Sequence, residues 1–266
     1  MRNRIFYGLM IVSLSVVTWS DCAIVDEFLA MQAADSVDLA QNESSLSTTT
    51  MDGIDQNTTP GQAAEKSVEN LGVYYTPAGC AVGTIDNEDP SKVTWELDHC
   101  TGPYGFVTIT GTINAQYSSI TDGIKVHYTG TGVQFNKAIM DLDTSVEVTM
   151  DGTKKNRAIT THTKGVGPRG NEVERDGTYQ LSWDWDSGCL SLDGGWETRV
   201  DNKSWTTTVT NWERCENECP KSGGKIEFVG GIRNVTVTLD FDGSDHVAWK
   251  SSRGSSGSIA LECSEK

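Results

Sequence analysis

The sequence is poor in positive charge. Its 266 residues include 21 Lys and Arg against 37 Asp and Glu, which gives a formal net charge of −16. Binding to nucleic acid depends on a basic surface that neutralises phosphates, and adsorption to anionic lipids depends on basic residues in the same way. The composition therefore argues against nucleic acid as a partner, and it leaves a lipid anchor as the only expected link to a membrane. Acidity of this kind is typical of a protein that stays soluble in an extracellular medium.

Motifs that carry chemistry are also missing. The four histidines are dispersed and belong to no nucleophile or metal-binding motif: His99, His127, His162 and His246. There is no Gly-x-Ser-x-Gly elbow, and the glycine-rich stretch 165–170 lacks the spacing of a phosphate loop. Acidic pairs such as Asp141 and Asp143 lie on the polar faces of expected strands, whereas a glycosidase needs two carboxylates across a cleft. We therefore expect no catalytic residue, metal or cofactor, and we rank a glycoside-active enzyme third among the possible functions.

Long apolar runs are confined to the N-terminus. Residues 1–4 are basic and residues 5–17 are mainly apolar, which is shorter than the roughly 20 residues that a membrane span needs. This pattern predicts a signal peptide over residues 1–20 and a mature protein that is secreted or lies at a bacterial outer surface or cell envelope. Cleavage after Ser20 fits the pattern. In the alternative, residues 19–22 form an atypical lipobox and Cys22 is lipidated, which leaves six cysteines, an even number.

Residues 21–70 differ in composition from the rest of the chain. Residues 23–40 carry apolar side chains at rough helical spacing, and residues 41–61 form a polar, low-complexity spacer. A second short helix is expected over residues 62–71. We therefore expect a helical and disordered tether ahead of a β domain over residues 71–266.

The β domain is predicted by period-2 alternation. Odd-numbered apolar residues run from Val107 to Tyr117, with Gly111 as the expected site of a bulge, and even-numbered ones run from Met140 to Met150. Glycine-containing turn pairs separate such segments. The expected fold is all-β and antiparallel. A sandwich, a barrel and an extended meander all fit the pattern.

Hairpin geometry predicts how the cysteines pair. A loop over residues 88–92 would place Ile85 opposite Trp95 and Cys80 opposite Cys100, at a separation that a disulfide bridges. Four other cysteines allow three pairings. A three-residue loop over residues 201–203 would place the next two opposite each other, giving the pairs Cys189–Cys215 and Cys219–Cys263. The rival arrangement is Cys215–Cys219 with Cys189–Cys263.

Five of the eight tryptophans fall between residues 182 and 215. Trp183 and Trp185 share a strand face, and Trp196 and Trp205 lie near one another in the following hairpin. Exposed aromatic rings can bind sugars, whereas buried rings fill the core. The sequence favours a non-catalytic secreted or cell-surface β protein of unspecified role. The alternative is a carbohydrate-binding module that uses these four tryptophans, and the partner would be a glycan or another surface protein.

Four short motifs together resemble a group of uncharacterised bacterial secreted proteins, many of them predicted lipoproteins. The motifs are Tyr-Tyr-Thr-Pro-Ala-Gly-Cys at residues 74–80, Cys-Thr-Gly-Pro-Tyr-Gly at 100–105, Gly-Pro-Arg-Gly-Asn at 167–171 and Arg-Cys-x-x-x-Cys-Pro at 214–220. The resemblance covers the chain from about Leu71 to the C-terminus. It implies a location in the bacterial envelope and a β-rich fold, and it brings no known activity.

Overall fold

The computed structural model describes residues 46–47, 53–55, 57–102, 108–151, 154–167, 170–184, 189–200, 203–215, 218–230 and 234–261. The predicted signal peptide, Cys22 and the helix expected over residues 23–40 lie outside these ranges. No helix among the described residues has the length and apolar character needed to cross a membrane.

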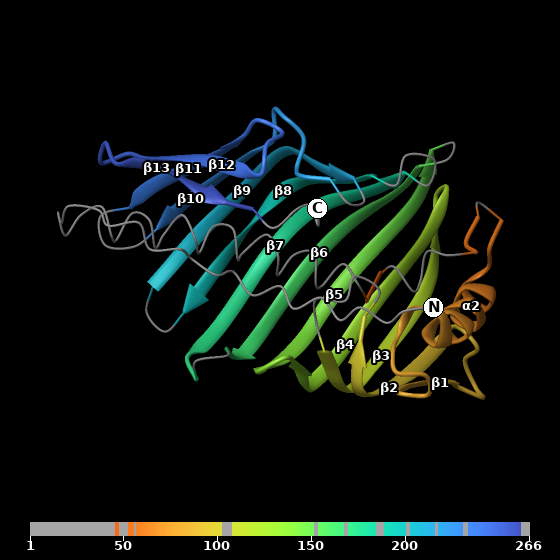
Figure 1. Ribbon diagram of the computed structural model, residues 1–266. Coiled ribbons are helices and arrows are strands. Elements are labelled where there is room, and N and C mark those ends of the chain that lie inside the picture. The colour runs from red at the N-terminus through yellow and green to blue at the C-terminus, as the bar shows by residue number, and fades with distance from the viewer. Residues whose placement is uncertain are drawn as a thin grey trace.

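The described chain forms one helix and one antiparallel sheet of 13 strands, and every strand pairs with its neighbours in sequence (Figure 1). The elements are α2 (Pro60–Tyr74), β1 (Ala81–Ile85), β2 (Lys92–Thr101), β3 (Thr108–Ile120), β4 (Gly123–Phe135), β5 (Ala138–Asp151), β6 (Lys154–Val166), β7 (Glu172–Asp184), β8 (Cys189–Val200), β9 (Lys203–Cys215), β10 (Lys225–Gly230), β11 (Val235–Phe241), β12 (His246–Ser251) and β13 (Ser256–Ala260). The sheet is not closed. The all-β antiparallel prediction is confirmed, and the extended meander is the arrangement that the chain adopts.

The sheet has one buried face and one outer face. Residues of the buried face stand directly opposite one another from strand to strand, as in the pairs Trp95–Ile113, Ala115–Tyr128 and Val126–Val146. The row continues across the middle strands through Ile159, Tyr179 and Gly194, and across the last strands through Phe228, Val237, Leu239 and Trp249. Because successive side chains of a strand alternate between faces, this row leaves mainly polar residues on the outer face.

Helix α2 covers the β1 end of the buried face. Thr59 and Gln62 form a capping box that begins the helix, and Pro60 follows the cap at the position where its missing N–H is tolerated. A Cβ atom on Gly83 of β1 would lie 2.7 Å from Val68 Cγ2, so the glycine allows the helix to pack closely on the sheet. The predicted short helix is confirmed, and it is longer than residues 62–71.

The expectation of a solvated spacer over residues 41–61 is wrong at three positions. Leu46, Ser47 and Ile54 are buried, and the two apolar side chains belong to the core. The hydroxyl of Tyr128 on β4 donates a hydrogen bond to the carbonyl oxygen of Leu46 at 3.4 Å. Leu46 and Ile54 therefore pack in the core, although the low-complexity sequence around them is typical of a linker.

The first predicted disulfide, Cys80–Cys100, is present, with a Cα–Cα distance of 5.4 Å. The predicted register is wrong, because Ile85 lies opposite Val93 and not opposite Trp95. Continuing the β1–β2 register would place Cys80 opposite Asp98. Cys100 follows two residues later, after an irregularity in the β2–β3 ladder at which His99 has a φ of 53°. The disulfide therefore joins two residues that are not directly opposed in the β1–β2 ladder.

The second predicted disulfide, Cys189–Cys215, is also present, and the two residues are directly opposed in the sheet. The loop between β8 and β9 holds two residues and not three, because Val200 pairs with Lys203. A register shift between Leu192 and Gly194 restores the opposition of the cysteines. This pairing excludes the rival arrangement. Cys219 also takes part in a disulfide, but Cys263 lies outside the described residues, so the Cys219–Cys263 pair stays a prediction.

Candidate functional site: a basic patch on the buried face

The buried face changes character across its middle strands. It is almost entirely apolar over β2–β4 and over β10–β11, where valine, isoleucine, leucine and aromatic residues fill it. Seven polar or charged residues lie buried between β5 and β9: Thr144, Lys155, Arg157, Thr161, Thr163, Arg175 and Thr207. The middle strands therefore present functional groups where the flanking strands present only hydrocarbon.

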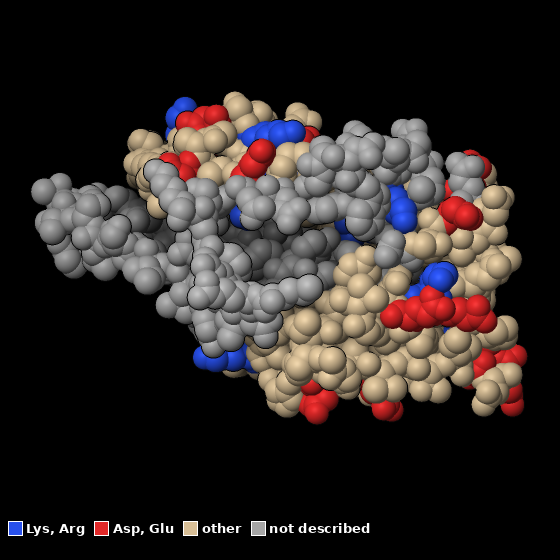
Figure 2. Space-filling model, turned by 45° about the vertical axis from the view of Figure 1, so that its right-hand side comes forward, with Lys and Arg blue, Asp and Glu red and all other residues tan. Residues whose placement is uncertain are grey.

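We call the three charged ones, Lys155 and Arg157 on β6 and Arg175 on β7, the basic patch. Their exposed fractions are 8%, 1% and 3%, and they are the only charged residues buried among those that the structure describes. Arg175 lies opposite Thr163, six residues along β6 from Arg157. In a chain with a net charge of −16, every buried charge in the described part is positive. Burying a cation costs free energy unless polar or anionic groups surround it, so this concentration must be compensated by favourable contacts. Figure 2 shows that both acidic and basic side chains are exposed on the surface of the described part of the molecule.

Aromatic rings hold the guanidinium group of Arg175. Its Cζ lies 4.6 Å from the centroid of the Trp196 ring and 6.0 Å from that of Tyr179. The two rings meet edge to face with centroids 5.7 Å apart. Gly177 lies directly opposite Trp196 and has no side chain in the way of the indole. The result is a cation–π arrangement in which the charge is fixed by rigid strands.

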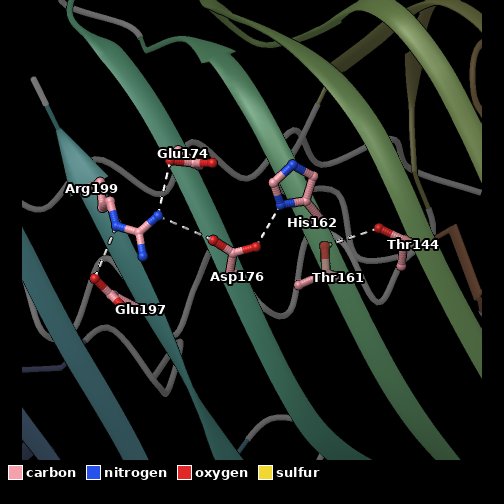
Figure 3. Close-up of polar contacts among 7 residues, drawn as sticks. All are labelled: Thr144, Thr161, His162, Glu174, Asp176, Glu197 and Arg199. Carbon is pink, nitrogen blue, oxygen red and sulfur yellow. Dashed lines mark hydrogen bonds and ion pairs between the residues drawn. The ribbon is translucent and has the colours of Figure 1, made fainter.

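Arg157 and Lys155 extend the patch along β6. Arg157 lies opposite Leu181 on one side and Val148 on the other, so apolar residues flank it on both neighbouring strands. Its Nη1 donates a hydrogen bond to the Oγ of Ser47 at 2.8 Å. Four residues further along β6 from Arg157, Thr161 shares a hydrogen bond between hydroxyl groups with Thr144 of β5, at 2.9 Å (Figure 3). Guanidinium, ammonium and hydroxyl groups on one apolar surface are the groups that bind a carboxylate, phosphate or sulfate.

The structure places the predicted tryptophans unevenly. Trp196 has 2% of its surface exposed and contacts Arg175, while Trp205 is half-buried and packs against the core. Trp183 belongs to β7 but its side chain is not described, and Trp185 lies outside the described residues. Two of the four candidate sugar-binding residues are thus placed, and one of them lines the basic patch.

Sequence reasoning missed the basic patch because residues 154–174 look like the polar end of a long hairpin. One signal was present. Lys155 and Arg157 are separated from Ile159 by an even number of positions, and so is Arg175 from Tyr179. In an extended strand each charged residue therefore shares a face with the apolar residue. Where the strand is regular, a charged residue on the same face as the apolar residues is expected to lie on the buried face of the sheet.

A second polar cluster lies on the outer face of the same strands (Figure 3). His162 Nδ1 lies 2.5 Å from Asp176 Oδ1, and Arg199 Nη1 lies 3.1 Å from Glu174 and 3.7 Å from Asp176. Arg199 Nε lies 3.0 Å from Glu197. The hydrogen bond to Glu174, followed by that to Glu197, raises the pKa of the Arg199 guanidinium above its ordinary value. These side chains are half-exposed, so the pairs are screened by water.

A comparison of the chain with protein-family models, with curated proteins and with solved structures finds no match. The residues of the chain itself are therefore the basis for any proposal about its function.

Proposed function

We propose that the protein is a non-catalytic, secreted or bacterial cell-surface β protein that binds an anionic, partly apolar ligand on the basic patch. One observation carries this proposal: all charged residues buried in the described part of the chain are basic, and all three belong to the buried face of β6 and β7. A surface with this composition is suited to a ligand that brings a negative group and hydrocarbon or a ring to the same place.

The chemistry of recognition follows from the arrangement. An Arg guanidinium can donate two parallel hydrogen bonds to a carboxylate or phosphate, and such charge-assisted bonds strengthen when water is excluded. Arg175, held against Trp196, would bind the anionic group, and Arg157 and Lys155 on the same face would add to the positive potential along it. The rings of Tyr179 and Trp196 lie beside the charge and give its surroundings an apolar character.

The disulfides bear on where the ligand would be met. Cys80–Cys100 and Cys189–Cys215 persist only in an oxidising compartment in ordinary cells, which supports a location outside the cytoplasm. Secretion to the medium, the cell surface and the bacterial envelope all offer such conditions, and the proposed signal peptide would direct the chain to them.

A direct test uses a fluorescent long-chain fatty acid as the probe and the matching fatty alcohol as its uncharged control. We expect the acid to bind the mature protein more tightly than the alcohol. Arg175→Gln and Arg157→Gln should each weaken binding of the acid by about 10-fold or more, because a hydrogen bond to a charged group is worth roughly 1.5–3 kcal/mol.

The matched control is Arg199→Gln, which removes an arginine from the outer face of the neighbouring strand and should leave binding unchanged. Circular dichroism of each variant shows whether the sheet is intact. Equal affinity for acid and alcohol, or affinity for the acid that neither patch variant reduces, would show that the basic patch is not the binding site.

A further inference from the structure

A line of acidic and imidazole side chains crosses the outer face of the middle strands. Asp143 on β5 lies directly opposite His162 on β6, His162 lies opposite Asp176 on β7, and Asp176 lies opposite Glu197 on β8. Glu174 precedes Asp176 by two residues and so shares its face. Four adjacent strands therefore bring metal-binding types of side chain into one row.

Three members of this row converge closely enough to share one ion. One ligand atom from each of His162, Glu174 and Asp176 lies within 4.8 Å of the other two. Ligands at the roughly 2.0–2.2 Å typical of zinc–nitrogen and zinc–oxygen bonds lie about 3.3–3.6 Å apart around a tetrahedral ion. The side chains are 40–46% exposed, so small rotations can reach this spacing and a water can complete the coordination.

Arg199 shows that the cluster already attracts positive charge. Its guanidinium bridges Glu174, Asp176 and Glu197, at distances of 3.1, 3.7 and 3.0 Å. Exposed ion pairs of this kind contribute little to stability, typically about 0–1 kcal/mol. An ion with two positive charges that is also bound by an imidazole nitrogen can therefore displace the arginine at low cost.

We propose that His162, Glu174 and Asp176 bind a divalent transition-metal ion, with Zn²⁺ as the representative, in competition with Arg199. Imidazole with carboxylates suits first-row ions such as zinc better than calcium or magnesium, which prefer oxygen ligands alone. The site lies on the face opposite to the basic patch and does not depend on the proposed ligand. It would link strands β6 and β7 on the solvent side.

The test is calorimetric titration of Zn²⁺ into the mature, chelator-treated protein. We expect one ion per chain and a melting temperature that rises with Zn²⁺ concentration, because an ion that binds only the folded state stabilises it. His162→Ala and Asp176→Asn should each reduce the affinity by about 10-fold or more. Arg199→Ala should increase the affinity, because it removes the competing cation.

His127→Ala is the matched control. The His127 Nε2 lies 2.7 Å from Asp143 on the same outer face, but this pair belongs to no metal-sized group of three among the described residues. Its loss should leave zinc affinity unchanged. Absence of zinc binding, binding that survives both His162→Ala and Asp176→Asn, or weaker binding in Arg199→Ala would each overturn the proposal. Circular dichroism spectra of the variants verify that the exposed substitutions leave the sheet folded.

Discussion

Replacing Gly177 with alanine should destabilise the centre of the sheet. A Cβ atom at this position would lie 2.5 Å from the Cβ of Trp196, and 3.1 Å from both the Cα of Trp196 and the carbonyl oxygen of Gly195. Ordinary contact begins near 3.4 Å. These neighbours are held by the backbone of β8, so β7 and β8 must move apart or the indole must leave its place against Arg175.

The magnitude follows from two opposing effects. Overpacking of a well-packed site costs about 1–3 kcal/mol. Alanine also reduces the conformational entropy of the unfolded chain, which returns about 0.4–1 kcal/mol. The expected net loss in the free energy of unfolding is about 1–2 kcal/mol. The same change should weaken binding of the fatty-acid probe, because it disturbs the contact that fixes Arg175.

Urea unfolding followed by tryptophan fluorescence measures the effect. With a slope of about 3 kcal/mol per molar urea, the midpoint should fall by about 0.3–0.7 M while the slope stays unchanged. Gly72→Ala is the matched control. Gly72 lies on the exposed side of α2 with nothing within 4 Å of its would-be Cβ, so alanine there should stabilise by about 0.5–1 kcal/mol through helix propensity. The opposite signs separate local packing from a general effect of adding a methyl group. A midpoint for Gly177→Ala equal to or above that of the wild type would refute the packing argument.

Three further predictions concern the disulfides, acid stability and the tryptophans. Replacing both Cys189 and Cys215 with alanine should lower the free energy of unfolding by about 3 kcal/mol for a loop of this length, measured by urea titration; a loss below 1 kcal/mol would contradict it. Hydrogen bonds from the N–H groups of Asp89 and Glu88 lower the pKa of the Asp86 carboxyl below 3.8, so their stabilisation is present at neutral pH and is lost as the pH falls through that lowered value. Asp86→Asn should therefore melt at a lower temperature than the wild type at pH 7, and its melting temperature should fall less on acidification. Melting temperatures of the two proteins that fall in parallel from pH 7 to pH 3 would contradict this prediction. If the alternative sugar-binding role holds, Trp183→Ala with Trp185→Ala should abolish signals on a glycan array; signals that persist would remove these residues from consideration.

Local patterns predicted the disulfides through reasoning that was partly wrong. The loop assumed for the first hairpin placed Ile85 opposite Trp95, two residues beyond its actual partner. The loop assumed for the second hairpin was one residue too long. Both predicted cysteine pairs are nevertheless correct. In the second hairpin a register shift between Leu192 and Gly194 made up the difference, and in the first the disulfide joins residues that are not directly opposed. Loop length is hard to predict because turns of two to five residues differ little in free energy, whereas the facing side chains decide which register buries the apolar row.

The alternation of apolar and polar residues by itself determined that the chain forms antiparallel strands, where most turns fall and which residues share a face. Tertiary structure decided that the sheet stays open, that Leu46 and Ile54 join its core, and that Lys155, Arg157 and Arg175 lie buried beside Trp196. The physical reason is that alternation depends only on neighbours along one strand. Burial, curvature and the contacts of a charge depend on which strands and segments lie across the sheet, and those contacts join residues far apart in the chain.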